Sequence, residues 1–152
     1  MIKSTDTLPS IFNDVIGPVM RGPSSSHTAA SWRIARTGIQ MLKDELLEAL
    51  VEFDKNGAWA TNYREQGTVI GMDGGLLGID IVDERILNPD IVAGAKGISI
   101  SYKISSFETD HTNTVRLSMT GRSGKMMQLV AVSTGGGMFE VRQYNGHPIY
   151  YK

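Results

Sequence analysis

Hydrophobic residues in the first half of the chain recur with the spacing of a helix. Between residues 28 and 45, apolar side chains return every three or four positions, as in an amphipathic helix with one face on a core. The pattern predicts a long helix, with Trp32 packed on a sheet. Arg33 and Arg36 are expected on the solvent face, or beside an anion at a subunit boundary. Shorter helices are expected over residues 9–15 and 89–95.

A second apolar segment, residues 68–78, is rich in glycine. Each glycine weakens an isolated helix by about 1 kcal/mol relative to alanine. Close packing against another element explains so many glycines better than a free helix does. We therefore expect a buried helix here.

The second half of the chain alternates between apolar and polar residues, which is the pattern of strands with one buried face. Strands are expected over residues 50–53, 98–104, 114–119, 126–132, 138–142 and 148–151. Asn145-Gly146 is a strong signal for a two-residue hairpin between the last two. The sequence predicts an α+β domain with helices packed on a mixed, largely antiparallel sheet.

Length, charge and hydropathy narrow the class of protein. A chain of 152 residues, 41% of them hydrophobic, is expected to form a single domain over residues 1–152. The 15 basic and 16 acidic residues form no long run of one sign, so neither nucleic acid nor a membrane surface is an expected partner. No apolar run approaches the ~18 residues of a transmembrane helix and no signal peptide is evident, so a cytoplasmic location is expected.

The chain contains no cysteine and three histidines. Disulfides, a thiolate nucleophile and a cysteine-ligated cluster held by this chain are therefore excluded. His27, His111 and His147 share no short ligand spacing, so no metal site is expected.

Residues 22–28, Gly-Pro-Ser-Ser-Ser-His-Thr, place polar chemistry at the predicted start of the long helix. The N–H groups of a first helical turn attract a carboxylate or phosphate. Ser26 or Thr28 is expected to cap the helix, and the remaining hydroxyls can then face a ligand. His27 can move a proton near neutral pH. The alternative is a solvated loop with one capping hydroxyl and a surface histidine.

Two further segments carry candidate site residues. Residues 110–114, Asp-His-Thr-Asn-Thr, precede a predicted strand, and by residue type alone His111 is a surface histidine. Residues 133–137, Ser-Thr-Gly-Gly-Gly, expose backbone N–H groups and allow positive φ, which suits an anion-binding nest. A plain turn or a β-bulge is the alternative for the glycines.

These motifs resemble those of a known family. Residues 16–20, Ile-Gly-Pro-Val-Met, followed by residues 22–30 resemble the signature of the beta subunit or beta domain of iron-sulfur-dependent L-serine dehydratase, also called L-serine ammonia-lyase. Residues 110–114 resemble the family's Asp-His-Pro-Asn-Thr, with Thr112 in place of proline. Residues 133–137 resemble its Ser-x-Gly-Gly-Gly. The fold implied is that family's beta domain, which is similar to allosteric substrate-binding domains.

The resemblance implies a role for each motif. His27 and His111 would serve in acid/base catalysis or substrate orientation. Residues 22–28, which we call the serine loop, would hold the substrate carboxylate. The substrate-binding residues implied in this way are Ser24, Ser25, Ser26, Thr28, Asn113, Thr114, Gly135 and Gly136.

The resemblance also implies the rest of an enzyme. Dehydratases of this kind use a 4Fe-4S cluster as a Lewis acid to deaminate L-serine to pyruvate and ammonia. Because this chain lacks cysteine, the cluster is expected on a partner alpha chain or domain, and this chain alone is expected to be inactive. L-serine or a similar small molecule is the expected substrate, and an oligomer is the expected assembly.

One segment departs from the family. Where the family commonly shows Lys-Gly-His-Gly-Thr-Asp, residues 64–69 replace the histidine by Gln66 and the aspartate by Val69. Gln66 cannot titrate, so a shifted substrate is one inference. A non-catalytic regulatory module that binds an anion or amino acid remains an alternative, as does a related hydro-lyase acting on another small substrate.

Overall fold

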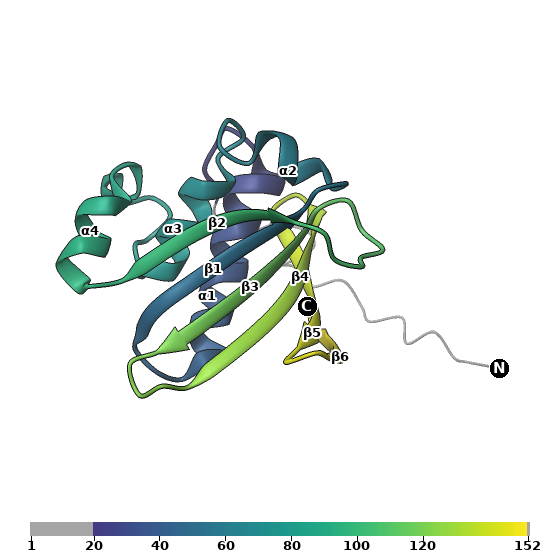
Figure 1. Ribbon diagram of the computed structural model, residues 1–152. Coiled ribbons are helices and arrows are strands. Elements are labelled where there is room, and N and C mark those ends of the chain that lie inside the picture. Colours follow the sequence, from purple (N-terminus) through teal and green to yellow (C-terminus); the bar gives the residue numbers. More distant parts are fainter. Residues whose placement is uncertain (1–19, 152) are drawn as a thin grey trace.

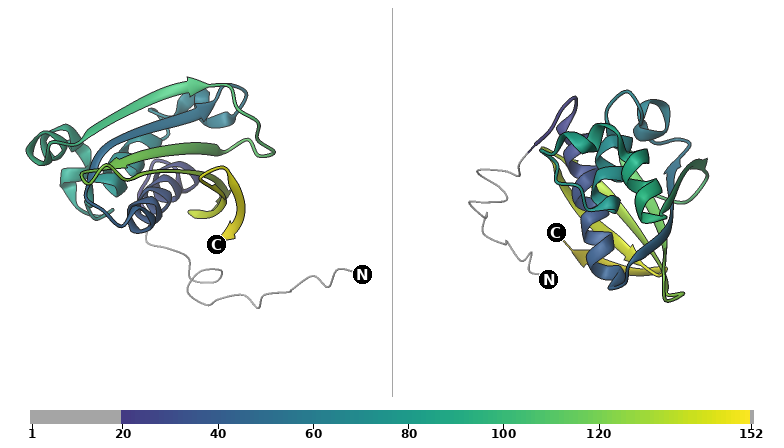
Figure 2. Two further views of the ribbon diagram at one scale, coloured as in Figure 1. Left: turned by 60° about the horizontal axis from the view of Figure 1, so that its bottom comes forward. Right: turned by 90° about the vertical axis from the view of Figure 1, so that its left-hand side faces the viewer.

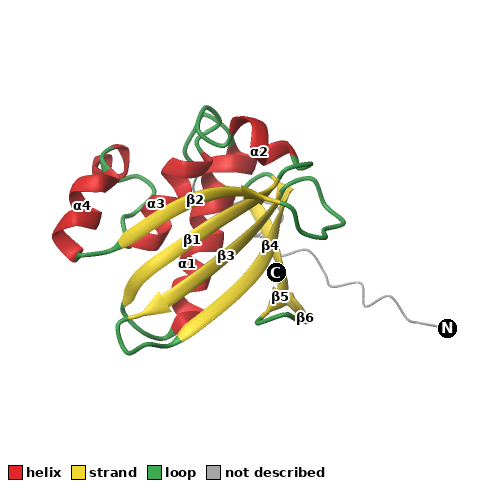
Figure 3. Cartoon of the chain, in the orientation of Figure 1, coloured by secondary structure: helices red, strands yellow, loops and turns green. Residues whose placement is uncertain are grey.

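The computed structural model describes residues 20–151 (Figure 1). The helix predicted over residues 9–15 lies outside this range. The described chain forms one six-stranded sheet with helices on one of its faces, as Figures 2 and 3 show. The predicted α+β class is therefore confirmed. No helix among residues 20–151 is both long enough and apolar enough to cross a bilayer.

Helices and strands follow one another in a simple order. The helices are α1 (Ala30–Leu42), which a π-helical turn (Ser25–Ala29) precedes, α2 (Ala58–Asn62), α3 (Thr68–Leu77) and α4 (Pro89–Lys96), which a 3-10 turn (Glu84–Leu87) precedes. The strands are β1 (Leu46–Asp54), β2 (Ser99–Ser105), β3 (Thr114–Gly121), β4 (Met126–Gly135), β5 (Met138–Tyr144) and β6 (His147–Tyr151).

The strands lie in the order β2-β1-β3-β4-β5-β6. β1 and β2 are parallel, and every other neighbouring pair is antiparallel. The sheet is thus mixed and largely antiparallel, as predicted. Figure 2 shows that β5 and β6 curl toward the side of the sheet that carries the helices. This curl brings the turn between β4 and β5 close to α1.

The main core lies between α1 and the sheet. Ile34 and Leu42 of α1 are fully buried against strand residues that include Phe53 and Leu117. The prediction that Trp32 packs on the sheet is wrong. Trp32 lies on the flank of α1 that faces α3, in a second cluster with Leu77, Ile79 and Ile86, and its indole N–H donates to the carbonyl of Ile79 over 2.8 Å.

The glycines of α3 let its backbone touch α1. A Cβ added to Gly71 would lie 2.1 Å from the carbonyl oxygen of Thr28, and one added to Gly75 would lie 2.5 Å from the Cβ of Ala35. Such distances are far inside van der Waals contact. The predicted burial and close packing of this glycine-rich helix are confirmed.

Candidate functional site

The serine loop joins α1 through a π-helical turn. The backbone N–H groups of His27 and Thr28 both donate to the carbonyl oxygen of Ser24, over 3.2 and 2.7 Å. No side chain caps α1, so the predicted capping role of Ser26 or Thr28 is wrong. The reason is that the backbone carbonyl of Ser24 already accepts from this turn, which leaves the hydroxyls to bond elsewhere. The side chain of Ser25 lies outside the described part of the structure.

Two hydroxyls of the loop converge on His27. Nδ1 of His27 lies 3.0 Å from Oγ of Ser24 and 3.0 Å from Oγ of Ser26, and the two hydroxyl oxygens lie 3.1 Å apart. The imidazole packs against Trp59 with ring centroids 5.6 Å apart. Burial lowers the pKa of His27, and the neighbouring side chain of Asn62 partly offsets this shift. A neutral imidazole beside two hydroxyls can accept a proton.

Four buried polar atoms around this loop lack a hydrogen-bond partner among the described residues. They are Nε2 of His27, Nε1 of Trp59, Oδ1 of Asn62 and Oγ1 of Thr68. Buried polar groups in folded proteins are nearly always paired, by protein, water or ligand. Trp59 and Thr68 are completely enclosed. A small polar molecule bound beside His27 would find Nε2 of His27 and Oδ1 of Asn62 without partners in the described protein.

Ser133 links the three sequence motifs. Its hydroxyl donates to the carbonyl of Ser26 over 2.8 Å, and its backbone N–H donates to the carbonyl of Asn113 over 2.9 Å. Ser133 is completely buried. The serine loop, the loop that contains His111 and the start of the glycine turn therefore meet at one point, at the end of β4.

The loop before β3 positions α2. The backbone N–H of Ala58 donates to the carbonyl and the hydroxyl of Thr112, over 2.9 and 3.0 Å. Nδ1 of His111 accepts from the backbone N–H of Asn113 over 3.0 Å. The hydroxyl of Thr114 donates to the carbonyl of His111 over 2.5 Å. In the described structure this hydroxyl, predicted to bind substrate, therefore stabilises the loop that contains His111. α2 in turn carries Trp59 to His27.

The glycine turn between β4 and β5 has its exposed tip at Gly136, with Gly135 half-buried and Gly137 buried. Gly135 and Gly136 have φ angles of +98° and +61°, and an added Cβ on either would meet no atom within 4 Å. Arg33 donates to the carbonyl of Gly137 over 3.1 Å, and its guanidinium lies 5.4 Å from the ring centroid of Phe139. The solvent-facing position predicted for Arg33 is therefore wrong, because the curled sheet brings this turn onto its side chain. A positive charge thus stands beside the turn.

The segment that departs from the family lies directly against the serine loop. The hydroxyl of Thr28 donates to the carbonyl of Gln66 over 3.2 Å. Gly67 has φ of +83°, and a Cβ there would lie 2.2 Å from the hydroxyl of Thr28. The hydroxyl of Thr28 is thus used to dock the start of α3, whereas Ser24 and Ser26 face His27.

No metal-ligand set exists in the part of the chain that the structure describes. Residues 20–151 contain no group of three or more His, Cys, Asp or Glu side chains placed to hold a metal ion, and the sequence has no cysteine. These residues do not fit an iron-sulfur cluster, which is held by cysteine thiolates.

Sequence reasoning did not identify three candidate site residues, which are Trp59, Asn62 and Ser133. The pair on α2 has a weak signal, because five residues make too short a helix for periodicity to reveal. Ser133 stood within a recognised motif, but only the glycines that follow it suggested a function. Its role depends on partners 107 and 20 positions away in sequence.

The geometry is that of an α+β domain with a buried polar cluster built from a serine-rich loop. No family model matches the chain. Two curated proteins do, and both are beta chains of L-serine dehydratase. A probable L-serine dehydratase beta chain of Bacillus subtilis (strain 168) is 39% identical over 137 residues, which is 90% of this chain and 60% of that protein. The L-serine dehydratase beta chain of Peptoniphilus asaccharolyticus is 29% identical over 140 residues, 91% of this chain and 62% of that protein.

The comparisons confirm the resemblance drawn from the motifs. It extends over about nine-tenths of this chain. The chain spans about three-fifths of the length of the curated relatives that it matches.

Proposed function

We propose that this chain is the beta component of an L-serine dehydratase and supplies the substrate-binding and proton-transfer groups for deamination of L-serine to pyruvate and ammonia. The names of the two relatives support this assignment. The observation that carries it is the set of unpaired buried polar atoms on His27 and on the segments packed against the serine loop. We expect the enzyme to be an oligomer and to act in the cytoplasm.

The serine loop is assigned to the substrate carboxylate. Hydroxyls of Ser24 and Ser26 can turn from His27 toward an anion, since each has a single donor that rotates freely. Arg33 beside the glycine turn adds a positive charge at the same end of α1. Together these groups favour a negatively charged substrate group.

The two histidines divide the proton transfers. His27 has a lowered pKa and is neutral near pH 7, so it is our candidate for the base that takes the α-proton. Nδ1 of His111 accepts a backbone hydrogen bond, which places its proton on Nε2 and makes that nitrogen a donor. His111 is therefore the candidate proton donor or orienting group.

Departure of the β-hydroxyl needs an electrophile that the described residues do not offer. We assign it to a 4Fe-4S cluster on a partner alpha chain, because this chain has no cysteine. Its own residues would then bind, orient and enclose the substrate against that partner.

The test is anaerobic co-expression of this chain with a cysteine-containing L-serine dehydratase alpha chain, followed by an assay for keto acid from L-serine. We expect a complex that is active, and that loses activity in His27→Ala and in His111→Ala. His147→Ala is the matched control, because His147 is exposed in the β5–β6 hairpin and should leave activity unchanged. Activity that survives both site substitutions would overturn the proposed roles.

A second function is favoured by one observation, the presence of Gln66 where the family commonly has a histidine. A complex that forms but is inactive on serine would indicate a related hydro-lyase with another substrate, with Gln66 and Val69 the first residues to exchange. If no complex forms and the isolated chain binds small carboxylates, a regulatory anion-binding module is the better assignment.

A further inference from the structure

α3 carries a buried carboxylate that the serine site does not use. Asp73 is 8% exposed, in a helix whose other buried residues are glycine, apolar residues and Thr68. Its Oδ1 accepts a hydrogen bond of 2.5 Å from the hydroxyl of Tyr102 on β2. Among the described residues, no cation lies within ion-pair distance of it. A carboxylate is costly to bury without a cation. The amide of an asparagine at this position could accept the hydrogen bond from Tyr102 just as well, without that cost.

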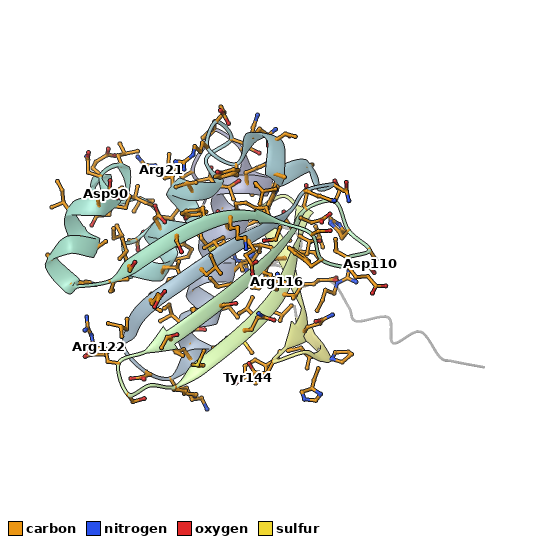
Figure 4. All side chains as sticks on the ribbon, in the orientation of Figure 1. Arg21, Asp90, Asp110, Arg116, Arg122 and Tyr144 are labelled. Atoms are coloured by element: carbon orange, nitrogen blue, oxygen red, sulfur yellow. The ribbon has the colours of Figure 1, made fainter. Side chains whose placement is uncertain are left out.

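Asp73 opens into a cavity of about 490 Å³ between α3, α4 and β2. Tyr102 stands beside it, and the apolar wall is formed by Val69, Leu77, Ala93, Ile98 and Ile100. Polar side chains line the rest of the cavity, among them Arg64, Asp90 and Ser99. An apolar wall with a few polar groups is typical of small-molecule sites. The cavity lies near the β2 edge of the sheet, where α4 and the labelled Asp90 can be seen in Figure 4.

The charges that line the cavity favour a cation. Asp73 and Asp90 are negative and Arg64 is positive, which leaves an excess of one negative charge. Burial chiefly, with a smaller contribution from Asp90, raises the pKa of Asp73 to about 6 against the opposing effects of the Tyr102 hydrogen bond and Arg64. Asp73 is therefore ionised at neutral pH, with Oδ2 lacking a donor from the described residues.

We propose that this cavity is a second binding site, for a small primary ammonium that carries a short apolar chain. The ammonium donates to Oδ2 of Asp73, and the alkyl chain lies along Val69, Leu77 and Ile100. This site is independent of the proposed dehydratase function, and its ligand is distinguished by charge from the carboxylate that the serine loop would hold.

In the experiment the 152-residue chain is titrated with n-butylammonium, and binding is monitored through the chemical shifts of the backbone amides in NMR spectra. We expect shifts at Asp73, Tyr102 and Ala93, and a dissociation constant that rises about tenfold from about pH 8 to about pH 5 as Asp73 is protonated. n-Butanol tests the apolar walls alone and should bind at least about tenfold more weakly. Asp73→Asn should abolish ammonium binding.

Two variants serve as checks. Asp80→Asn removes the same charge from the exposed loop after α3 and should bind n-butylammonium as the unchanged chain does. Tyr102→Phe removes the hydrogen bond that lowers the pKa of Asp73, so the pH midpoint of binding should move upward. The proposal is overturned if n-butanol binds as tightly as the ammonium, if Asp73→Asn retains binding, or if the shifts lie away from the cavity.

Discussion

The hydroxyl of Ser133 donates a 2.8 Å hydrogen bond to the backbone carbonyl of Ser26, 107 positions earlier in the chain. This bond ties the end of β4 to the serine loop, one residue before His27. Since the Ser133 backbone also donates to Asn113, one buried serine sets the distance between three segments that carry the candidate site.

Ser133→Ala should destabilise the chain. The substitution removes the donor from the partly buried carbonyl of Ser26, and a fully buried group left unsatisfied would cost about 1–3 kcal/mol, so we expect a loss at the lower end of that range. Urea unfolding measures the change. Ser99→Ala, at an exposed position of β2, should stay within about 0.5 kcal/mol of the unchanged chain. Equal losses in the two variants would contradict the structural role given to Ser133.

Gly71→Ala should destabilise the contact between α1 and α3. The new methyl group would lie 2.1 Å from the carbonyl of Thr28 and 2.3 Å from the hydroxyl of Ser31, and overpacking of this kind costs about 1–3 kcal/mol. Gly94→Ala on α4 is the matched control, because its Cβ meets nothing within 4 Å. There the same change should stabilise by about 0.4–1 kcal/mol, so thermal unfolding temperatures should shift in opposite directions.

Asn62→Ala should lower the pKa of His27 further. Burial already lowers that pKa, and Asn62 is the group that partly raises it. Imidazole ¹⁵N shifts followed against pH report both the pKa and the tautomer. Because the folded pKa lies below the unfolded one, His27 contributes stability that is present above the unfolded pKa and is lost as pH falls toward the folded pKa. An unchanged titration in Asn62→Ala would show that the two side chains do not interact.

Arg116→Met should destabilise the face of the sheet that carries no helix, where Figure 4 labels Arg116. Its guanidinium forms two hydrogen bonds of 2.8 and 2.9 Å with Glu52, which is 6% exposed. We expect a loss of about 2 kcal/mol, less than for a fully enclosed pair, because the Arg116 side chain is 26% exposed.

The pH dependence of that pair gives a second readout. The hydrogen bonds from Arg116 chiefly, and from Ser105, lower the pKa of Glu52. Its contribution is therefore present above the unfolded pKa of a glutamate and is lost as pH falls through the lower folded value. Arg116→Met should flatten this acid-side loss in urea unfolding curves. A double variant with Glu52→Gln should recover part of the stability, since no buried charge then remains.

Most helices and strands were predictable because each has its own periodic pattern of apolar residues or its own turn residues in the sequence. The last hairpin is an example, since Asn145 and Gly146 have φ of +49° and +80°, as their residue types favour. β1 was predicted too short, because Leu46 and Glu48 lie at a break in the strand register that disturbs the alternation. α2 was missed, because its start depends on the hydrogen bonds that the Ala58 N–H donates to Thr112, far away in sequence.

Pairwise contacts of the candidate site were less predictable than its residues. The motifs identified His27 and His111, but no pattern in sequence indicates that Trp59 packs on an imidazole or that Ser133 bonds to Ser26. The sequence likewise suggested a helix cap at Ser26 or Thr28, whereas the chain enters α1 by a π-helical turn. Hydrogen bonds and contacts between segments that are distant in sequence determine both the packing around His27 and the way the chain enters α1. The assigned substrate-binding roles stay predictions.

The contact between α1 and α3 restricts how the site can open. Gly67 and Gly71 leave no space between α3 and Thr28, so the serine loop cannot swing out as a hinged lid and must travel with both helices as one body. α2 is different, because it is short and its first N–H is held by Thr112 at the surface. Even so, its Trp59 is completely buried in the main core beside Phe53, so α2 cannot open separately from the sheet and the surroundings of His27 are fixed from both sides.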